Sequence, residues 1–180
     1  GMKIWLVRHA RVQLAPGLCY GASDVPADPG HTQQVAEALA AVLPRGARMW
    51  VSGLGRARQL AAAVCAQRAD LDTAQGDVRL NEMDFGQWEL QRWDAIPRRA
   101  FDHWMADFAD HRFGGAESTQ QVIDRVAAAL AATRAGGGEH AVWFTHAGVI
   151  RAVQFLLAHG DARIAGVHQW PEQAPPPGGS

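Results

Sequence analysis

The chain has 180 residues and a formal net charge of −1, and 48% of its residues are hydrophobic. A chain of this size and composition buries a real core in one ordinary domain, which excludes an intrinsically disordered protein. Its near-zero charge provides no bulk attraction to nucleic acid or to a membrane surface, so neither is an expected partner.

The sequence predicts a single cytoplasmic domain with a mobile end. The apolar start of the chain reaches Arg8 too soon for a signal peptide, and no apolar run approaches the roughly 18 residues of a spanning helix. Cys19 and Cys65 are too few and too far apart for a disulfide framework, so we expect reduced thiols. Because the proline- and glycine-rich end has little that can pack, we expect one domain over residues 1–172 and a mobile tail over 173–180.

Apolar runs at residues 4–7, 49–51 and 141–144 predict three core strands. Helical patterns alternate with these runs: an alanine-rich segment, 53–68, follows the second run, and a helix beginning at Gly148 follows the third. Strands that alternate with helices favour a mostly parallel sheet. We therefore expect an α/β fold, a three-layer sandwich in which helices cover both faces of the central sheet.

Two further helices are predicted from the spacing of apolar side chains. The first ends at Pro44 and Gly46, and its apolar face is expected to hold Val35, Leu39, Val42 and Leu43. The second begins at a capping box formed by Ser118 and Gln121 and closes at the glycines 136–138.

Residues 81–112 interrupt the alternation of strands and helices with aromatic side chains, namely Phe85, Trp88, Trp93, Phe101 and Trp104. Two interpretations remain open from the sequence. The segment either leaves the sheet and covers a pocket, or it forms a satellite cluster packed under a long loop.

Polar side chains follow all three predicted strands. They are Arg8 and His9 after the first strand, Ser52 with Arg56 and Arg58 after the second, and Thr145 with His146 after the third. Ligands of open α/β sheets bind beyond the carboxyl ends of the strands, so these groups can converge. Guanidinium forks and a helix start suit phosphate, and a histidine nitrogen can act as nucleophile or base. We therefore expect a small phosphate ester as the ligand.

A phosphoryl group that leaves an alkoxide also needs a proton donor. Glu82 lies between apolar neighbours, where burial can raise its pKa toward neutrality. Asp84 is the competing candidate on chemistry alone. The histidines outside the predicted site fit no zinc spacing, so no metal is expected.

Five segments in this order resemble the histidine phosphatase superfamily, the fold class of cofactor-dependent phosphoglycerate mutase. They are Leu6-Val-Arg-His9, Ser52-Gly-Leu-Gly-Arg-Ala-Arg-Gln59, Leu80-Asn-Glu-Met-Asp-Phe-Gly-Gln-Trp-Glu89, Gly114-Gly-Ala-Glu-Ser118 and Thr145-His-Ala-Gly148. The ordered set is far more specific than the Arg-His pair alone.

The resemblance implies a role for each matched residue. His9 would be the nucleophile that becomes phosphohistidine, and Arg8, Arg56 and His146 would bind the phosphate. Glu82 would protonate the leaving group and then activate water against the phosphoenzyme. The family pattern Ser-x-x-x-Arg-Ala favours Arg56 over the arginine two residues further on. No cofactor or metal is implied, and a homodimer is expected from the family alone.

A narrower likeness concerns the substrate. Cys19-Tyr-Gly21 followed by Asp24-Val-Pro26 resembles the alpha-ribazole phosphatase branch, which trims a nucleotide precursor in cobalamin assembly. It implies a phosphomonoesterase acting on alpha-ribazole 5′-phosphate. The alternatives are a phosphatase for another small phosphate ester, a phosphoglycerate mutase-like enzyme, and a non-catalytic relative that binds phosphorylated ligands. The Glu-Thr that follows the mutases' Arg-His-Gly is absent here, which speaks against a mutase.

Four positions depart from the family pattern. Ala10 and Leu90 stand in place of glycine, Gly53 in place of a common proline, and Leu60 where threonine is frequent. The change at Ala10 is small, so we expect the nucleophile to keep its place. Leu90 is expected to reshape the rim of the pocket.

Overall fold

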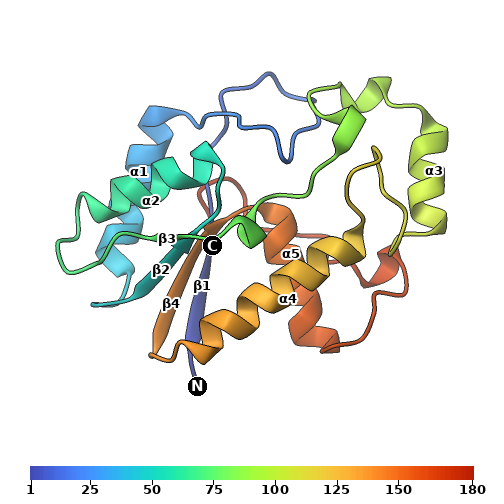
Figure 1. Ribbon diagram of the computed structural model, residues 1–180. Coiled ribbons are helices and arrows are strands. Elements are labelled where there is room, and N and C mark those ends of the chain that lie inside the picture. Colours follow the sequence, from blue (N-terminus) through green and yellow to red (C-terminus); the bar gives the residue numbers. More distant parts are fainter.

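A four-stranded sheet lies between two pairs of helices in the computed structural model, which describes residues 1–180 (Figure 1). The strands are β1 (Lys3–Arg8), β2 (Arg48–Val51), β3 (Gln75–Gly76) and β4 (His140–Thr145). They lie in the order β1-β4-β2-β3, and every neighbouring pair is parallel. The expected α/β fold is therefore confirmed. The short strand β3 was not predicted, because two residues carry no periodicity.

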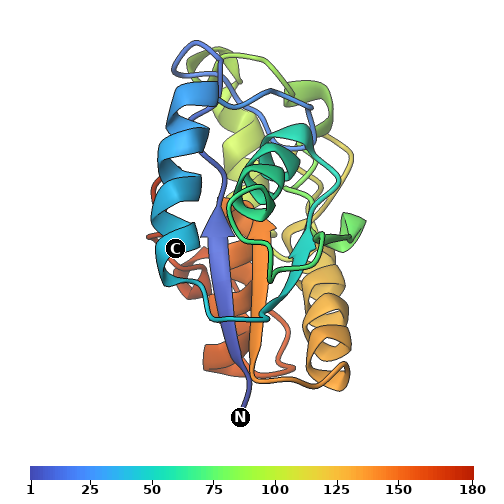
Figure 2. The same ribbon diagram turned by 90° about the vertical axis from the view of Figure 1, so that its left-hand side faces the viewer.

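The helices are α1 (Pro29–Val42), α2 (Gly55–Cys65), α3 (Arg98–Ala106), α4 (Thr119–Ala135) and α5 (Ala147–His159). Short 3₁₀ turns lie at Val78–Leu80, Gly86–Trp88, Trp93–Ala95 and Val167–Gln169. The pair α1 and α2 covers one face of the sheet, and the pair α4 and α5 covers the other (Figures 1 and 2). None of these helices is long and apolar enough to cross a membrane.

The central strand β4 supplies side chains to both faces of the sheet. Val142 and Phe144 belong to the core under α1 and α2, whereas Ala141 and Trp143 belong to the core under α4 and α5. Successive side chains of a strand point to opposite faces, so one buried strand serves two cores. The result is the three-layer sandwich predicted from the sequence.

The capping box at the start of α4 is confirmed. The Ser118 hydroxyl oxygen accepts a hydrogen bond from the Gln121 backbone N–H at 3.2 Å, and the Gln121 side-chain oxygen accepts one from the Ser118 N–H at 2.9 Å. The helix ends before Gly136, as predicted.

The aromatic segment between α2 and α4 lies beyond the carboxyl ends of the strands, with α3 far from the sheet (Figures 1 and 2). Phe113 is fully buried and packs with Cys19 and Ile96 in a small cluster separate from the two sheet cores. Several partly buried aromatic side chains surround it: Phe85, Trp88, Phe101 and Trp104. The segment therefore forms a satellite cluster, and its Phe85, Trp93 and Trp104 also line a cavity, so both interpretations agree with the structure. Burial raises the pKa of the Cys19 thiol to about 12, so the thiol stays protonated and acts as a packing group.

The prediction that Val42 faces the core was wrong. Val42 is 57% exposed, although Leu39 and Leu43 are buried. The buried face of α1 also includes Thr32 and Ala36, and these residues shift its centre around the helix, away from Val42.

The pair Val64 and Val42 tests this assignment, because the same side chain is fully buried on α2 and exposed on α1. We expect Val64→Ala to lower the free energy of unfolding by about 2 kcal/mol, through lost burial and a residual cavity. The matched change Val42→Ala should alter it by less than about 0.5 kcal/mol. Urea denaturation measures both values, and equal losses would contradict the described burial.

Candidate active site

The register of the sheet brings the two candidate histidines together. The last paired residues of β1 and β4 are Arg8 and Thr145, so His9 and His146 leave neighbouring strands side by side. Their ring centroids are 5.1 Å apart. Ser52 follows β2, and its hydroxyl oxygen lies 2.8 Å from His146 Nε2. The three strand ends therefore converge, as the sequence predicts.

His9 is held in the state that a nucleophile needs. Its side chain is 2% exposed, and its Nδ1 lies 2.8 Å from the Ala10 carbonyl oxygen. A carbonyl only accepts hydrogen bonds, so Nδ1 carries the hydrogen and the neutral ring keeps a free lone pair on Nε2. Burial lowers the pKa of His9 to about 3, with the positive charges of Arg56 and Arg8 acting in the same direction and the bond to Ala10 opposing them. The imidazole is therefore neutral at physiological pH.

His146 is a neutral hydrogen-bond donor. It is fully buried, and burial, together with the charge of Arg56, lowers its pKa well below 6.5. The Ser52 hydroxyl oxygen accepts a hydrogen bond from the Leu54 N–H and can donate its own hydrogen to His146 Nε2. When Ser52 donates in this way, the single ring hydrogen of His146 lies on Nδ1, an atom without a hydrogen-bond partner in the protein.

Arg56 is the arginine that α2 directs toward the histidines. Its guanidinium is fully buried and donates to the carbonyl oxygens of Ser23 at 2.7 Å and Gly21 at 2.6 Å. It also lies over the Tyr20 ring, 5.2 Å from the ring centroid. Arg58 is exposed on the same helix. The geometry therefore agrees with the choice of Arg56.

The end of the chain passes beside Arg8. The Arg8 guanidinium donates to the Pro175 carbonyl oxygen at 3.1 Å, and its backbone N–H donates to the Gly179 carbonyl oxygen at 2.9 Å. The Gly178 N–H donates to the His9 carbonyl oxygen at 2.7 Å. This segment thus lies along the free edge of β1. Its mobility, and the domain boundary at residue 172, stay predictions.

Three buried donors of these residues have no partner in the protein: Arg8 Nε, Arg56 Nε and His146 Nδ1. A buried donor without a partner costs about 1–3 kcal/mol, so such groups are rare and need an explanation. An anion with several oxygens is the kind of group that satisfies such donors. The arrangement is therefore chemically suited to hold a phosphoryl group next to a nucleophile.

The Glu82 side chain lies against the first turn of α5, the helix that begins directly after His146. Its carboxylate accepts hydrogen bonds from the Met83 N–H at 2.9 Å and the Gly148 N–H at 3.0 Å. A Cβ at position 148 would collide with this carboxylate, so the close approach requires glycine. The helix start predicted to favour an anion is thus occupied by the Glu82 carboxylate. The Asp84 carboxylate accepts from the Gly86 N–H instead, at 2.8 Å.

Glu89 supports the site and was not assigned a role from the sequence. Its carboxylate accepts hydrogen bonds from the Gly21, Ser23 and Phe85 N–H groups at 2.8 to 3.0 Å, and from the Ser23 hydroxyl at 2.6 Å. Burial opposes ionisation of this carboxylate, but these hydrogen bonds outweigh it and lower the pKa of Glu89. Because the carbonyls of Gly21 and Ser23 hold Arg56, Glu89 positions that guanidinium. A single sequence contains the residue but gives no sign of these partners.

The structure shows what two departures from the family pattern change locally. Leu90 has φ 65°, a left-handed conformation in which glycine is unstrained. It is not among the residues lining the cavities at Glu82, so the predicted change in the pocket rim is not seen there. Gly53 donates its N–H to the Asn81 side-chain oxygen at 2.7 Å, a bond that proline cannot make.

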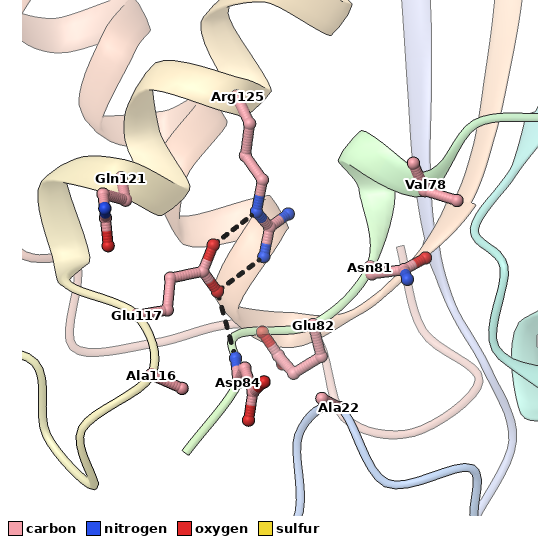
Figure 3. A pocket seen from close by; sticks show the side chains of 9 residues that line it. All are labelled: Ala22, Val78, Asn81, Glu82, Asp84, Ala116, Glu117, Gln121 and Arg125. Carbon is pink, nitrogen blue, oxygen red and sulfur yellow. Dashed lines mark hydrogen bonds and ion pairs between the residues drawn. The ribbon is translucent and has the colours of Figure 1, made fainter. Parts of the chain in front are cut away.

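Glu82 lines two cavities of different character. The first is polar, has a volume of about 430 Å³ and is lined by Glu82, Asp84, Glu117 and Arg125 among others. Figure 3 shows the Arg125 guanidinium paired with Glu117, which also accepts the Asp84 N–H. The second cavity has a volume of about 210 Å³, and four of the ten residues that line it are aromatic. No three histidine, cysteine or acidic side chains are arranged to hold a metal ion, and metal independence stays a prediction.

Comparison with known proteins places these observations in a family context. Residues 4–171 match the model of the histidine phosphatase superfamily (branch 1). The crystal structure of TTHB049 from Thermus thermophilus is similar, with 28% identity over 98% of this chain and 90% of that chain, and a TM-score of 0.71. A phosphoglycerate mutase structure from the same organism has 28% identity, the same coverage and a TM-score of 0.70.

A more distant structure supports the fold alone. The mycobacterial glucosyl-3-phosphoglycerate phosphatase has 24% identity over 84% of this chain and 77% of that chain, with a TM-score of 0.69. Among curated proteins, none matches the chain.

The lowered pKa of His9 predicts a pH-dependent stability. Between pH 6.5, the ordinary value, and about 3, the unfolded chain binds a proton at His9 that the folded protein does not bind. Stability from this group is complete above pH 6.5 and is lost as the pH falls, by on the order of 2 kcal/mol at pH 5. Urea denaturation at pH 7 and pH 5, in buffer without phosphate, should therefore show a smaller loss for His9→Asn than for the wild type.

The exposed residue His168 provides the matched control for this measurement. The variant His168→Asn should keep the full loss of stability between pH 7 and pH 5. An equal loss in His9→Asn and the wild type would contradict the burial of a neutral His9.

The two arginines of α2 give a second test of the geometry. Arg56→Met should weaken the binding of inorganic phosphate by at least about tenfold, because charge-assisted hydrogen bonds to the anion are lost. Arg58→Met should leave the dissociation constant within about twofold, since an exposed charge is screened by solvent. Isothermal titration calorimetry measures both, with thermal unfolding as the check on folding. The reverse order would overturn the assignment of Arg56.

Proposed function

The chain belongs to the histidine phosphatase superfamily (branch 1), and on that premise we propose that it is a phosphomonoesterase acting through phosphohistidine at His9. The observation that carries the proposal is the neutral, buried His9 beside three buried donors that lack protein partners. These donors belong to Arg8, Arg56 and His146. A non-catalytic phospho-ligand protein needs the donors but not a free imidazole lone pair among them.

In the first step of the proposed reaction, His9 Nε2 attacks phosphorus and the bond from phosphorus to the leaving oxygen breaks. The guanidinium groups of Arg8 and Arg56 and the His146 Nδ1–H hold the phosphoryl oxygens, and these bonds strengthen as charge develops in the transition state. Glu82, in its protonated form, gives its proton to the leaving oxygen. The products of this step are an alcohol and phosphohistidine.

In the second step, the Glu82 carboxylate takes a proton from water while the water oxygen attacks phosphorus. The bond between His9 Nε2 and phosphorus breaks, phosphate leaves, and the imidazole returns to its neutral form. The N–H groups of Met83 and Gly148 hold the carboxylate in one place for both proton transfers. The sum is the hydrolysis of a phosphate monoester, and no step calls for a metal ion.

The proposed substrate is alpha-ribazole 5′-phosphate. The segment that resembles the alpha-ribazole phosphatase branch provides the Gly21 and Ser23 carbonyls that bind Arg56. Its Asp24 carboxylate accepts the Gly55 N–H at 2.7 Å, at the start of α2. The resemblance thus falls on residues that shape the phosphate site. We further propose a cytoplasmic protein without nucleic-acid or membrane partners, in which two copies form a homodimer.

A phosphoglycerate mutase is the second candidate, favoured by the 28% identity to the Thermus thermophilus mutase structure. The two functions differ in what becomes of the phosphoryl group. A mutase returns it to the substrate, whereas the proposed enzyme passes it to water. Conversion of 3-phosphoglycerate into 2-phosphoglycerate at a rate above that of phosphate release would favour the mutase.

Phosphate release from alpha-ribazole 5′-phosphate in EDTA tests the substrate and the metal-free chemistry together. We expect rapid release by the wild type and none by His9→Ala, because the variant lacks the nucleophile. Activity that EDTA abolishes and zinc or magnesium restores would contradict metal independence. Release from other esters but not from this one would leave the phosphatase standing and reject the substrate.

The proton donor is tested by varying the leaving group. Glu82→Gln should slow hydrolysis of an alkyl phosphate by about 10²- to 10⁴-fold, because the alkoxide then leaves without a proton. The loss should be much smaller for p-nitrophenyl phosphate, whose leaving group needs no proton. Asp84→Asn is the matched control and should retain the wild-type dependence on the leaving group. If the two variants exchange these behaviours, Asp84 is the acid.

A further inference from the structure

The aromatic cavity is lined in part by Glu82, the candidate proton donor. Its volume is about 210 Å³, and both Glu82 and Gly148 line it. The rest of its wall includes Phe85, Trp93, Trp104 and Trp170. Gly148 belongs to the first turn of α5, directly after His146. A leaving group whose oxygen receives the Glu82 proton therefore lies beside a cavity that holds four aromatic side chains in its wall.

Arg151 is an unpaired cation in the wall of this cavity. Its Nε is buried and has no hydrogen-bond partner, and its guanidinium makes one long contact, 3.4 Å to the Glu172 carbonyl oxygen. It belongs to none of the five ion pairs in the structure. The acidic side chain in the same wall, Glu82, accepts its hydrogen bonds from Met83 and Gly148 instead. A buried donor left in this state is suited to an acceptor atom brought by a ligand.

The polar cavity on the other side of Glu82 is suited to a different kind of group. Its acidic side chains are Glu82, Asp84 and Glu117, and its cation, Arg125, is already neutralised by Glu117 (Figure 3). Such a lining accepts hydrogen bonds from hydroxyl groups and offers no aromatic face. A flat ring is therefore favoured in the aromatic cavity rather than in the polar one.

We propose that the aromatic cavity binds a flat, neutral heterocyclic ring carried by the leaving alcohol, as in a nucleoside 5′-phosphate. Tryptophan faces stack on such a ring, and the Arg151 guanidinium donates to a ring acceptor or lies over the ring. A cavity of about 150 Å³ accommodates benzene, so this larger one has room for a bicyclic ring. The same guanidinium disfavours a cationic ring. This inference rests on the proposed function, because it concerns the leaving group of that reaction.

The test compares two esters that share the sugar 5′-phosphate and differ in the ring: alpha-ribazole 5′-phosphate and ribose 5-phosphate. The wild type should have a kcat/KM at least about fivefold higher for the ester with the ring, the lower end of what base stacking contributes. Trp93→Leu and Arg151→Met should each move this ratio toward one. Trp88→Leu is the matched control, since Trp88 packs on Phe113 but does not line the cavity, and it should keep the wild-type ratio.

The ratio separates this inference from its alternatives. A purely structural role for Trp93 or Arg151 would lower kcat/KM equally for both esters and leave the ratio unchanged, which overturns the subsite. A wild type that prefers neither ester, or prefers ribose 5-phosphate, also overturns it while the proposed phosphatase stands. Absence of phosphate release from both esters and from p-nitrophenyl phosphate by folded protein would reject the proposed function, and the subsite with it.

Discussion

The site depends on the register between β1 and β4. Because Arg8 pairs with Thr145, the next residue of each strand is a histidine, and the two rings emerge side by side. A slip of one residue would turn alternate side chains to the opposite face of the sheet and separate the rings. The two cores that pack on the opposite faces of β4 therefore stabilise the fold and also hold this register. They fix the geometry of the proposed nucleophile.

Burial of positive charge is the second constraint on the site. Arg56 is held by backbone carbonyls rather than by an ion pair with a carboxylate, so its unpartnered Nε is available to an anion. The acidic residue that makes this possible, Glu89, holds the loop that carries those carbonyls. Burial keeps His9 neutral, and the charges of Arg56 and Arg8 act in the same direction. An environment that lowers a histidine pKa and leaves donors unpaired is costly for folding, which is typical of sites kept for binding and catalysis.

The sequence predicted the parts of this protein that local pattern encodes. Apolar runs located the strands β1, β2 and β4, and the Ser118–Gln121 spacing located the start of α4. Residues at strand ends were predicted together because parallel strands deliver them to one edge. The errors and omissions involve contacts between distant segments. The exposure of Val42 depends on where α1 rests on the sheet, and the role of Glu89 depends on a loop 66 to 68 residues earlier in the chain.

A phosphoryl group that passes through His9 forms phosphohistidine, and trapping that intermediate tests the proposed reaction most directly. The protein is mixed with p-nitrophenyl phosphate, quenched in alkali to preserve phosphohistidine, and digested for peptide mass spectrometry. We expect one phosphoryl group on His9 in the wild type, more of it in Glu82→Gln, and none in His9→Asn. Phosphate on another residue, or continued hydrolysis by His9→Asn, would contradict a reaction through His9.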